Sequence, residues 1–304
     1  MGKRTAKCKF KFPGLKTHCY NVSMTIAKVR TVSGLRARVK TWRQAGLKVG
    51  LVPTMGALHA GHLSLVAGVL KKTGRAVVSI FVNPDQFGGG EDFENYPRNE
   101  EEDCKMLEAA GAHLVYLPSA AEMYPEGPGA TVRVAGLSEV LCGKFRPGHF
   151  EGVATVVTKL LLQCQPDAAI FGEKDFQQLR VIQKLAADLD IPVEILGGAT
   201  VREADGLAMS SRNAYLTAAQ RATAAALPKT IKTLLNKAQA GEDLRTLEKE
   251  GRAGLLLNGF EAVDYLEFRE AGDLSLSRKA GKETRLFAAA WIGKTRLIDN
   301  MKVE

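Results

Sequence analysis

The arrangement of the chain follows from ten residues, Pro53-Thr54-Met55-Gly56-Ala57-Leu58-His59-Ala60-Gly61-His62. Residues 48–52, directly before them, are mostly apolar and predict a buried strand. Residues 63–72, directly after them, place apolar side chains at helical spacing. The order therefore predicts a strand, a turn that contains glycine and a helix N-terminus, with two histidines in the first helical turn.

The predicted turn suits an anionic ligand. Exposed backbone N–H groups and the positive end of the helix dipole attract anions at such a place. Neutral imidazoles can donate N–H groups to phosphate oxygens, and the dipole lowers their pKa values. No Gly-Lys-Ser/Thr follows, so the turn is not a Walker A loop. A single histidine near a helix start is usually a cap or a packing residue, whereas a pair flanked by Gly56 and Gly61 favours a binding site.

Composition restricts the class of protein. The length of 304 residues allows one large or two moderate domains. The contents of 45% hydrophobic and 25% charged residues are typical of soluble globular proteins, and no apolar run is long enough to predict a membrane span. The five cysteines include no C-x-x-C pair, which argues against a zinc site or a disulfide framework. We therefore expect a cytoplasmic protein.

The beginning of the chain is basic. No aspartate or glutamate precedes Asp85, and the net charge of the whole chain is +9. Such a start is compatible with a nucleic-acid-binding arm, a transit peptide or a segment upstream of an internal start at Met24, and we favour the last. We expect residues 1–23 to be a basic, disordered extension. A basic protein also suits small anionic substrates.

Strands and helices alternate through the first two thirds of the chain. Besides the strand at 48–52 and the helix at 63–72, the patterns predict strands at 75–82, 113–117, 167–171 and 192–196, and helices at 34–45, 99–110, 151–163 and 175–188. This rhythm predicts an α/β domain over residues 24–200, built on a doubly wound parallel sheet of the Rossmann type.

The pattern changes near residue 200. Two helices at 218–238 and 243–257 precede an alternating strand at 262–268 and a hairpin of residues 285–292 and 295–298. We predict a smaller α+β domain over residues 201–304, which carries the loop Met209-Ser210-Ser211-Arg212.

Several stretches, taken together and in order, resemble the pantoate–β-alanine ligase family. Besides the ten residues quoted first, they are Phe81-Val82-Asn83-Pro84-Asp85-Gln86-Phe87, Tyr96-Pro97-Arg98, Arg146-Pro147-Gly148-His149-Phe150-Glu151-Gly152-Val153-Ala154-Thr155-Val156-Val157, Phe171-Gly172-Glu173-Lys174-Asp175-Phe176-Gln177-Gln178-Leu179 and Met209-Ser210-Ser211-Arg212-Asn213. The resemblance runs from about residue 24 to the C-terminus and is densest through Asn213.

The resemblance implies a nucleotidyltransferase-type Rossmann fold with a His-x-Gly-His motif, a homodimer, and the use of ATP and Mg²⁺. It implies a two-step ligase that makes pantothenate, a coenzyme A precursor. Pantoate attacks the α-phosphate of ATP and releases pyrophosphate, and β-alanine then attacks the pantoyl adenylate and releases AMP. Neither a nucleic acid nor a membrane is expected as a partner.

The resemblance also implies roles for particular residues. His62, with an acid role, His59, Lys174 and Arg212 would be catalytic, because preorganised donors and cations stabilise the charge that develops around the α-phosphate. The implied ATP-binding residues are Met55, Gly56, Ala57, Leu58, His59, Ala60, Gly61, His62, Gly172, Glu173, Lys174, Asp175, Val201, Met209, Ser210, Ser211 and Arg212.

Gln86 and Gln178 would orient pantoate, and Gln86 would also touch β-alanine. Asp175 and, with less support, Asp103 are candidates near Mg²⁺, which prefers a few carboxylates together with phosphate oxygens. Taken alone, the Gly-Glu-Lys-Asp turn is more typical of an ordinary helix start, with Asp175 as its N-cap. Asp85 departs from the family, which commonly has an uncharged residue there, and an anion at this place would weaken pantoate binding unless it points to solvent.

Two other functions fit parts of the sequence. A nucleotidyltransferase that makes a dinucleotide or another pyrophosphoryl-linked product needs the same histidine turn, but it does not need the Asn-Pro-x-Gln-Phe loop. An RNA-binding module fits the basic N-terminus, but it predicts aromatic residues interleaved with the basic ones, and few are present there.

Overall fold

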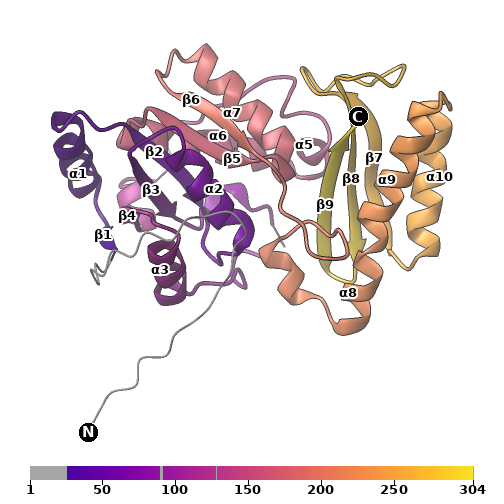
Figure 1. The fold of residues 1–304 in the computed structure, drawn as a ribbon, viewed down its shortest axis with the longest axis horizontal. Coiled ribbons are helices and arrows are strands. Elements are labelled where there is room, and N and C mark those ends of the chain that lie inside the picture. Colours follow the sequence, from indigo (N-terminus) through magenta and orange to yellow (C-terminus); the bar gives the residue numbers. More distant parts are fainter. Residues whose placement is uncertain (1–25, 90–91, 128, 304) are drawn as a thin grey trace, which may run out of the picture.

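The computed structural model describes residues 26–89, 92–127 and 129–303. The predicted basic extension, residues 1–23, lies outside this part of the chain. The described residues form a six-stranded parallel sheet and a three-stranded antiparallel sheet, and helices pack on both (Figure 1). The predicted fold class is confirmed. Within these same residues, no helix is both long and apolar enough to cross a membrane.

The parallel sheet has the strand order β1-β4-β3-β2-β5-β6. The strands are Ala27–Val29 (β1), Val49–Thr54 (β2), Arg75–Ile80 (β3), Leu114–Tyr116 (β4), Ala168–Gly172 (β5) and Glu194–Gly198 (β6). From β2 the chain builds first toward β3 and β4 and later toward β5 and β6. The direction therefore reverses between β2 and β5, and ligands of such sheets bind outside the carboxyl ends of the strands at this point.

Helices follow the strands in the alternation that the sequence predicts. They are Val32–Gln44 (α1), Ala60–Leu70 (α2), Glu100–Ala109 (α3), Ala120–Met123 (α4), Cys142–Phe145 (α5), His149–Cys164 (α6) and Phe176–Asp188 (α7). Short 3₁₀ turns lie at Pro84–Gln86 (η1), Glu173–Asp175 (η2) and Ser211–Tyr215 (η3). Asn99 caps α3 through its side chain, which accepts a hydrogen bond from the N–H of Glu102, as the sequence predicts.

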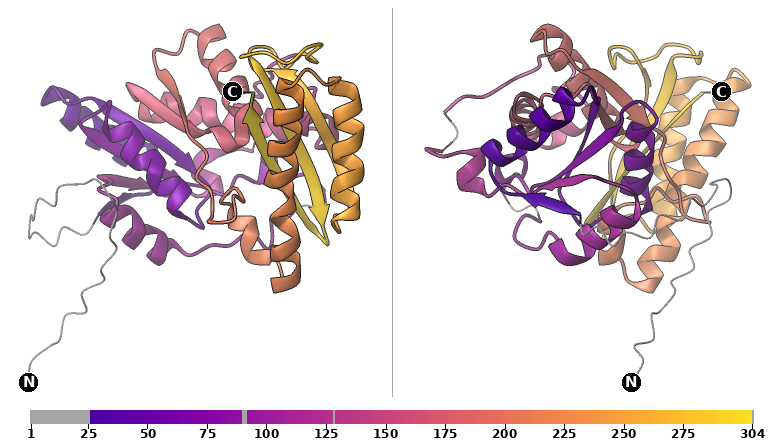
Figure 2. Two further views of the ribbon diagram at one scale, coloured as in Figure 1. Left: turned by 45° about the vertical axis from the view of Figure 1, so that its right-hand side comes forward. Right: turned by 60° about the vertical axis from the view of Figure 1, so that its left-hand side comes forward.

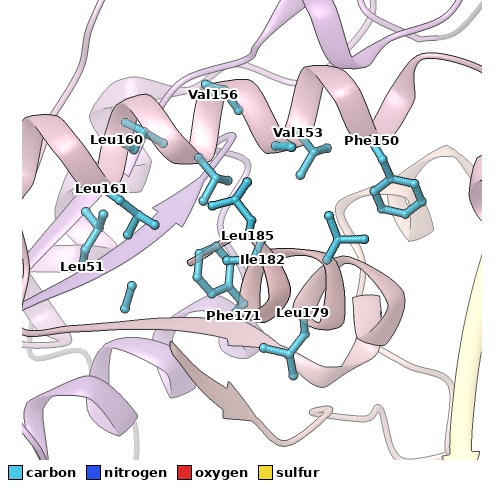
Figure 3. Packing of buried hydrophobic residues seen from close by; sticks show 14 of the residues in the cluster. Leu51, Phe150, Val153, Val156, Leu160, Leu161, Phe171, Leu179, Ile182 and Leu185 are labelled. Carbon is cyan, nitrogen blue, oxygen red and sulfur yellow. The ribbon is translucent and has the colours of Figure 1, made fainter. Parts of the chain in front are cut away.

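Both faces of the parallel sheet are buried, because successive side chains of a strand point to opposite faces. Leu51 of β2 belongs to a core that includes side chains of α1, α6 and α7. Figure 3 shows Leu51 together with side chains of α6 and α7. Its neighbour Val52 belongs to a separate core with side chains of α2 and α3. Burial on two faces explains why these strands are almost continuously apolar.

The second unit is built on the strands Ala262–Glu270 (β7), Thr284–Ile292 (β8) and Thr295–Lys302 (β9). Its helices are Ala218–Ala224 (α8), Ala226–Gln239 (α9) and Leu244–Leu257 (α10), and Figure 2 shows α9 and α10 on one face of this sheet. From the other face, Tyr265 and Phe287 reach the core that contains Leu51. The two units therefore share packed surface.

Three details differ from the predicted elements. The single helix predicted at 218–238 is interrupted at Ala225, because Pro228 has no N–H to donate to the carbonyl four residues earlier. Strand β6 begins two residues later than predicted, because Pro192 has no N–H to donate to the neighbouring strand. The first N–H that does so is that of Glu194, which bonds to the carbonyl of Asp167. The three-residue edge strand β1 was not predicted.

Candidate active site

A cavity of about 240 Å³ lies at the carboxyl ends of β2 and β5. Most of the predicted site residues line it. They are Met55, His59, Gly61, His62, Gln86, Gly172, Lys174, Asp175, Gln178, Val201, Met209, Ser210, Ser211 and Arg212. Six predicted residues do not line it, and these are Gly56, Ala57, Leu58, Ala60, Asp103 and Glu173. The loops that follow β2, β3 and β5 of the parallel sheet therefore meet one loop from the second unit around one space.

The turn after β2 is held by a buried carboxylate. Both oxygens of Asp103 accept backbone N–H groups, from Ala57 at 3.0 Å and from Leu58 at 2.8 Å. Gly56 has a φ of +86°, and a Cβ there would lie 3.0 Å from Asp103 Oδ2, so glycine suits both the conformation and the space. Asp103 thus supports the turn from behind, and the prediction that it contacts a metal does not fit its place in the structure.

The two histidines cap α2 with their own rings. His59 Nδ1 accepts from the N–H of Gly61 at 3.1 Å, and His62 Nδ1 accepts from the N–H of His59 at 3.3 Å. A neutral imidazole that accepts through Nδ1 carries its proton on Nε2. Both rings therefore have an Nε2–H to donate, and their centroids lie 4.1 Å apart.

Burial keeps both imidazoles neutral. It lowers the pKa of His59 to about 4, helped by the positive charge of Lys174, and it lowers the pKa of His62 to about 3, helped by His59. At neutral pH, His62 is therefore a neutral hydrogen-bond donor rather than a charged acid.

The turn after β5 carries Lys174 and Asp175 on the cavity wall. Asn300 of β9 holds this turn, because its amide donates to the backbone carbonyls of Glu173 at 3.0 Å and Lys174 at 2.9 Å. The carboxylate of Glu173 lies 3.5 Å from the guanidinium of Arg285 on β8, which accounts for its position away from the cavity. Asp175 is the residue before α7, but its side chain forms no capping hydrogen bond.

The Ser-Ser-Arg loop is tied to a segment of the first unit that the sequence reasoning did not assign to the site. Arg212 donates to both oxygens of Asp92, through Nε at 3.1 Å and Nη2 at 2.8 Å. The Tyr96 hydroxyl lies 3.2 Å from the Ser211 hydroxyl. Tyr96 also lines the cavity, and its only sequence signal was the Tyr-Pro-Arg motif.

One wall of the cavity is apolar and carries the two glutamines. Its apolar side chains include those of Phe81, Val153, Val156, Val157 and Leu160. Gln86 and Gln178 also line the cavity, and Gln86 Nε2 donates to Met55 Sδ. Asp85, by contrast, is exposed and lies outside the cavity lining, so its charge points to solvent.

Two further polar residues of the lining were not predicted to belong to the site. Arg146 and His149 lie just before and at the start of α6. His149 Nδ1 lies 2.8 Å from the backbone oxygen of Gln86, and His149 Nε2 lies 2.9 Å from Arg146 Nη1. The Arg-Pro-Gly-His motif contained both residues, but a histidine near a helix start has no distinctive pattern.

A metal site made of protein ligands alone is not found in the described ranges, where no group of three or more histidine, cysteine, aspartate or glutamate side chains converges. Asp175 is the carboxylate of the lining, and its side chain is 46% exposed. One carboxylate beside a phosphate-binding place suits a cation that is held mainly by phosphate oxygens and water.

The position of the cavity and its donors define the class of protein. Doubly wound sheets bind nucleotides at the switch point, with phosphates at a helix N-terminus, and here that helix begins with two N–H donors. The protein is a nucleotide-binding α/β enzyme.

Comparisons with known proteins narrow this class. The family described as pantoate-beta-alanine ligase matches residues 27–302. A pantothenate synthetase of Paramagnetospirillum magneticum is 56% identical over 283 residues, which are 93% of this chain and 100% of the relative. The chain belongs to the pantoate–β-alanine ligase family.

Two solved structures agree with this assignment. A crystal structure of pantothenate synthetase from Thermus thermophilus is similar with a TM-score of 0.85 and 42% identity, and it covers 91% of this chain and 99% of its own. A pantoate-beta-alanine ligase from Francisella tularensis, complexed with beta-gamma ATP and beta-alanine, has a TM-score of 0.74 and 32% identity, with 91% and 97% covered.

Proposed function

We propose that this chain condenses (R)-pantoate with β-alanine at the expense of ATP, through a pantoyl adenylate, and so makes pantothenate for coenzyme A biosynthesis. Membership of the pantoate–β-alanine ligase family over residues 27–302 supports this function. The observation that carries it in the structure is a pair of neutral histidines with Nε2–H donors. Both histidines line the same cavity as the cations Lys174 and Arg212.

In the first step, a carboxylate oxygen of pantoate bonds to the α-phosphorus of ATP, and the bond to the leaving pyrophosphate breaks. Negative charge grows on the oxygens of the α-phosphate and on the pyrophosphate. We propose that His59 and His62 donate Nε2–H groups to these oxygens while Lys174 and Arg212 offset the charge. Ser210 and Ser211 add hydroxyl donors from the second unit.

In the second step, the neutral amine of β-alanine attacks the carbonyl carbon of the adenylate and forms the C–N bond. AMP leaves with the C–O bond electrons, and the nitrogen releases one proton to solvent. Gln86 and Gln178 carry both donors and acceptors, which suits the hydroxyl and carbonyl groups of the pantoyl chain. The valines of α6 provide an apolar surface for its two methyl groups.

We also propose that Mg²⁺ accompanies ATP, with Asp175 as the carboxylate beside it. The single exposed carboxylate fits a cation that phosphate oxygens hold. When bound, Mg²⁺ would offset the charge of the triphosphate. A homodimer, which the family resemblance implies, and a cytoplasmic location, which the cysteine pattern favours, are further proposals, and sedimentation and cell fractionation test them.

The decisive experiment follows pyrophosphate and AMP release from ATP and Mg²⁺. Pyrophosphate should appear only with pantoate, and AMP and pantothenate should appear only when β-alanine is added as well. Release that does not depend on pantoate would contradict the proposed substrate. It would leave a nucleotidyltransferase that acts on another acceptor.

A further inference from the structure

Arg146 is a cation on the cavity wall to which the two proposed steps assign no role. Within the described lining, the lysine and arginine side chains are Lys174, Arg146 and Arg212. Lys174 and Arg212 belong to the turns proposed to hold phosphates. Arg146 instead comes from the turn before α6, the helix that carries the apolar valines. Its permanent positive charge suits an anionic group of a substrate other than the phosphates.

Two acceptors among the described residues help to orient the guanidinium of Arg146. The carbonyl oxygen of Gln86 can only accept, so His149 Nδ1 must donate to it over their 2.8 Å contact. His149 Nε2 then has a lone pair and accepts from Arg146 Nη1 at 2.9 Å. Arg146 Nη2 in turn lies 3.4 Å from the same carbonyl of Gln86. A neutral His149 with its proton on Nδ1 thus fixes the arginine against the Gln86 backbone.

Local backbone geometry brings these groups together. Gly148, with a φ of +82°, turns the chain between Arg146 and His149, and the N–H of His149 bonds to the carbonyl of Arg146 at 3.1 Å. Gly152 lets α6 approach the same loop, since a Cβ there would lie 2.1 Å from the carbonyl oxygen of Asp85. The arginine therefore lies where the turn before α6 packs against the loop of Gln86, the glutamine proposed to face the acyl group.

The reactants supply one anion that no other residue accounts for. The phosphates of ATP have the histidine pair, Lys174 and Arg212, and the carboxylate of pantoate is consumed in the first step. The carboxylate of β-alanine never reacts, and it stays two methylene groups away from the attacking nitrogen. A planar guanidinium is well suited to a carboxylate, which it can bind through two parallel hydrogen bonds.

We propose that Arg146 binds the carboxylate of β-alanine and that His149 is a positioning residue that aims its guanidinium. The inference rests on the proposed function and adds the residue that selects the amino acid. A carboxylate bound to Arg146 fixes how far the amine can reach toward the adenylate. The enzyme should therefore favour β-alanine over amines that lack a carboxylate or carry it at another distance.

The test separates the two half-reactions in the full-length enzyme. ATP–pyrophosphate exchange with pantoate reports adenylation, and pantothenate formation at varied β-alanine reports the second step. Arg146→Ala should raise the KM for β-alanine roughly 10- to 150-fold, the value of a hydrogen bond to a charged group, while the exchange rate changes by no more than a few-fold. Arg133→Ala, at an exposed arginine outside the lining, is the matched control and should change neither.

A neutral acceptor shows whether the effect concerns the carboxylate. Propylamine has no carboxylate, so its kcat/KM with wild-type enzyme should be low and should not fall further in Arg146→Ala. His149→Ala should raise the KM for β-alanine. His149→Gln keeps a donor and an acceptor, so its KM should stay close to that of the wild type. The Arg146→Ala/His149→Ala double variant should be no worse than Arg146→Ala alone, because His149 acts through the arginine.

Several results would overturn the assignment. One such result is an unchanged KM for β-alanine in Arg146→Ala. Another is an equal loss of rate in ATP–pyrophosphate exchange and in amide formation, which would indicate that Arg146 contacts pantoate or ATP. Equal losses with propylamine and β-alanine would assign it a structural role. If Arg146→Ala does not fold, Arg146→Gln gives the same comparison. Wild-type enzyme without pantoate-dependent exchange would instead reject the proposed function itself.

Discussion

The two histidines of the first helical turn act with both ring nitrogens. One nitrogen of each ring caps the backbone, and this leaves the other as a donor on a ring that lines the cavity. A histidine that merely faced the site could rotate or change tautomer, whereas these rings are locked by their own helix. Preorganised donors of this kind cost no reorganisation when charge develops in the transition state.

Replacing His62 should therefore affect turnover more than binding. We expect His62→Ala to lower kcat by roughly 10²- to 10³-fold, the loss typical of one oxyanion donor. Steady-state kinetics with pyrophosphate detection measures the effect, and His113→Ala serves as a control at a histidine outside the cavity. Full activity of the His62 variant would remove this residue from the mechanism.

The same burial makes stability depend on pH. In the unfolded chain each histidine binds a proton near its ordinary pKa of about 6.5, but in the folded protein His59 does so only near pH 4 and His62 near pH 3. The unfolded state thus binds more protons in between, and stability is lost as the pH falls below about 6.5. We expect a loss of roughly 1 to 2 kcal/mol per histidine between pH 6.5 and pH 5.

Urea unfolding at the two pH values measures this loss. His62→Gln has no imidazole to protonate, so its stability should fall less than that of the wild type. An identical fall in both proteins would show that His62 does not contribute to the pH dependence.

At the scale of the element, the turn after β2 depends on α3. Asp103 is the buried acceptor for two N–H groups of a turn that lies more than forty residues earlier in the chain. Burial raises the pKa of its carboxyl group, and the two backbone donors act in the opposite direction. The helix and the turn consequently form one unit.

Asp103→Asn should weaken this unit without changing the metal requirement. An amide has one acceptor oxygen, so one of the two N–H groups loses its partner, at a cost of about 1–3 kcal/mol. Chemical unfolding measures the loss, and Glu101→Gln, at an exposed carboxylate of the same helix, is the control. An increase in the Mg²⁺ concentration needed for half-maximal activity would instead return Asp103 to the metal site.

The elements that the sequence predicted well have local causes. Asn99 is a cap, the valines of α6 form a helical stripe, and both features are visible within a few residues. The parts that were missed depend on partners distant in sequence. Strand β1 exists because it pairs with β4, and Asp92 belongs to the site because Arg212 reaches it across 120 residues. His149 was missed because one of its partners is a backbone carbonyl, which leaves no mark in the sequence.

At the scale of the molecule, the cavity is completed by two units that meet over it. The Asp92–Arg212 ion pair and the Tyr96–Ser211 contact join them at the end proposed to hold the phosphates. Asp92 thus accepts hydrogen bonds from Nε and Nη2 of Arg212, an arginine that we propose to bind phosphate. ATP must compete with this carboxylate for the same donors.

Removing that competition should favour ATP. We expect Asp92→Asn to lower the dissociation constant for ATP by roughly three- to tenfold, since a neutral amide binds a guanidinium less strongly than a carboxylate does. Calorimetric titration measures the change. Arg212→Ala should weaken ATP binding and adenylation more than amide formation from preformed adenylate. Unchanged or weaker ATP binding in Asp92→Asn would show that the pair instead aligns Arg212 for the nucleotide.

The hydrogen bonds from Asn300 to the turn that carries Lys174 determine whether the protein can be produced as two separate fragments. A protein fragment that stops near residue 200 would contain the entire parallel sheet, both histidines and the lysine itself. In this fragment the carbonyls of Glu173 and Lys174 would lack the Asn300 amide that donates to them. The ammonium group would then sit on a loose loop. Co-expressing the two pieces should recover activity only when they reassociate, because the last strand of the protein holds the turn of Lys174, which we propose to be catalytic.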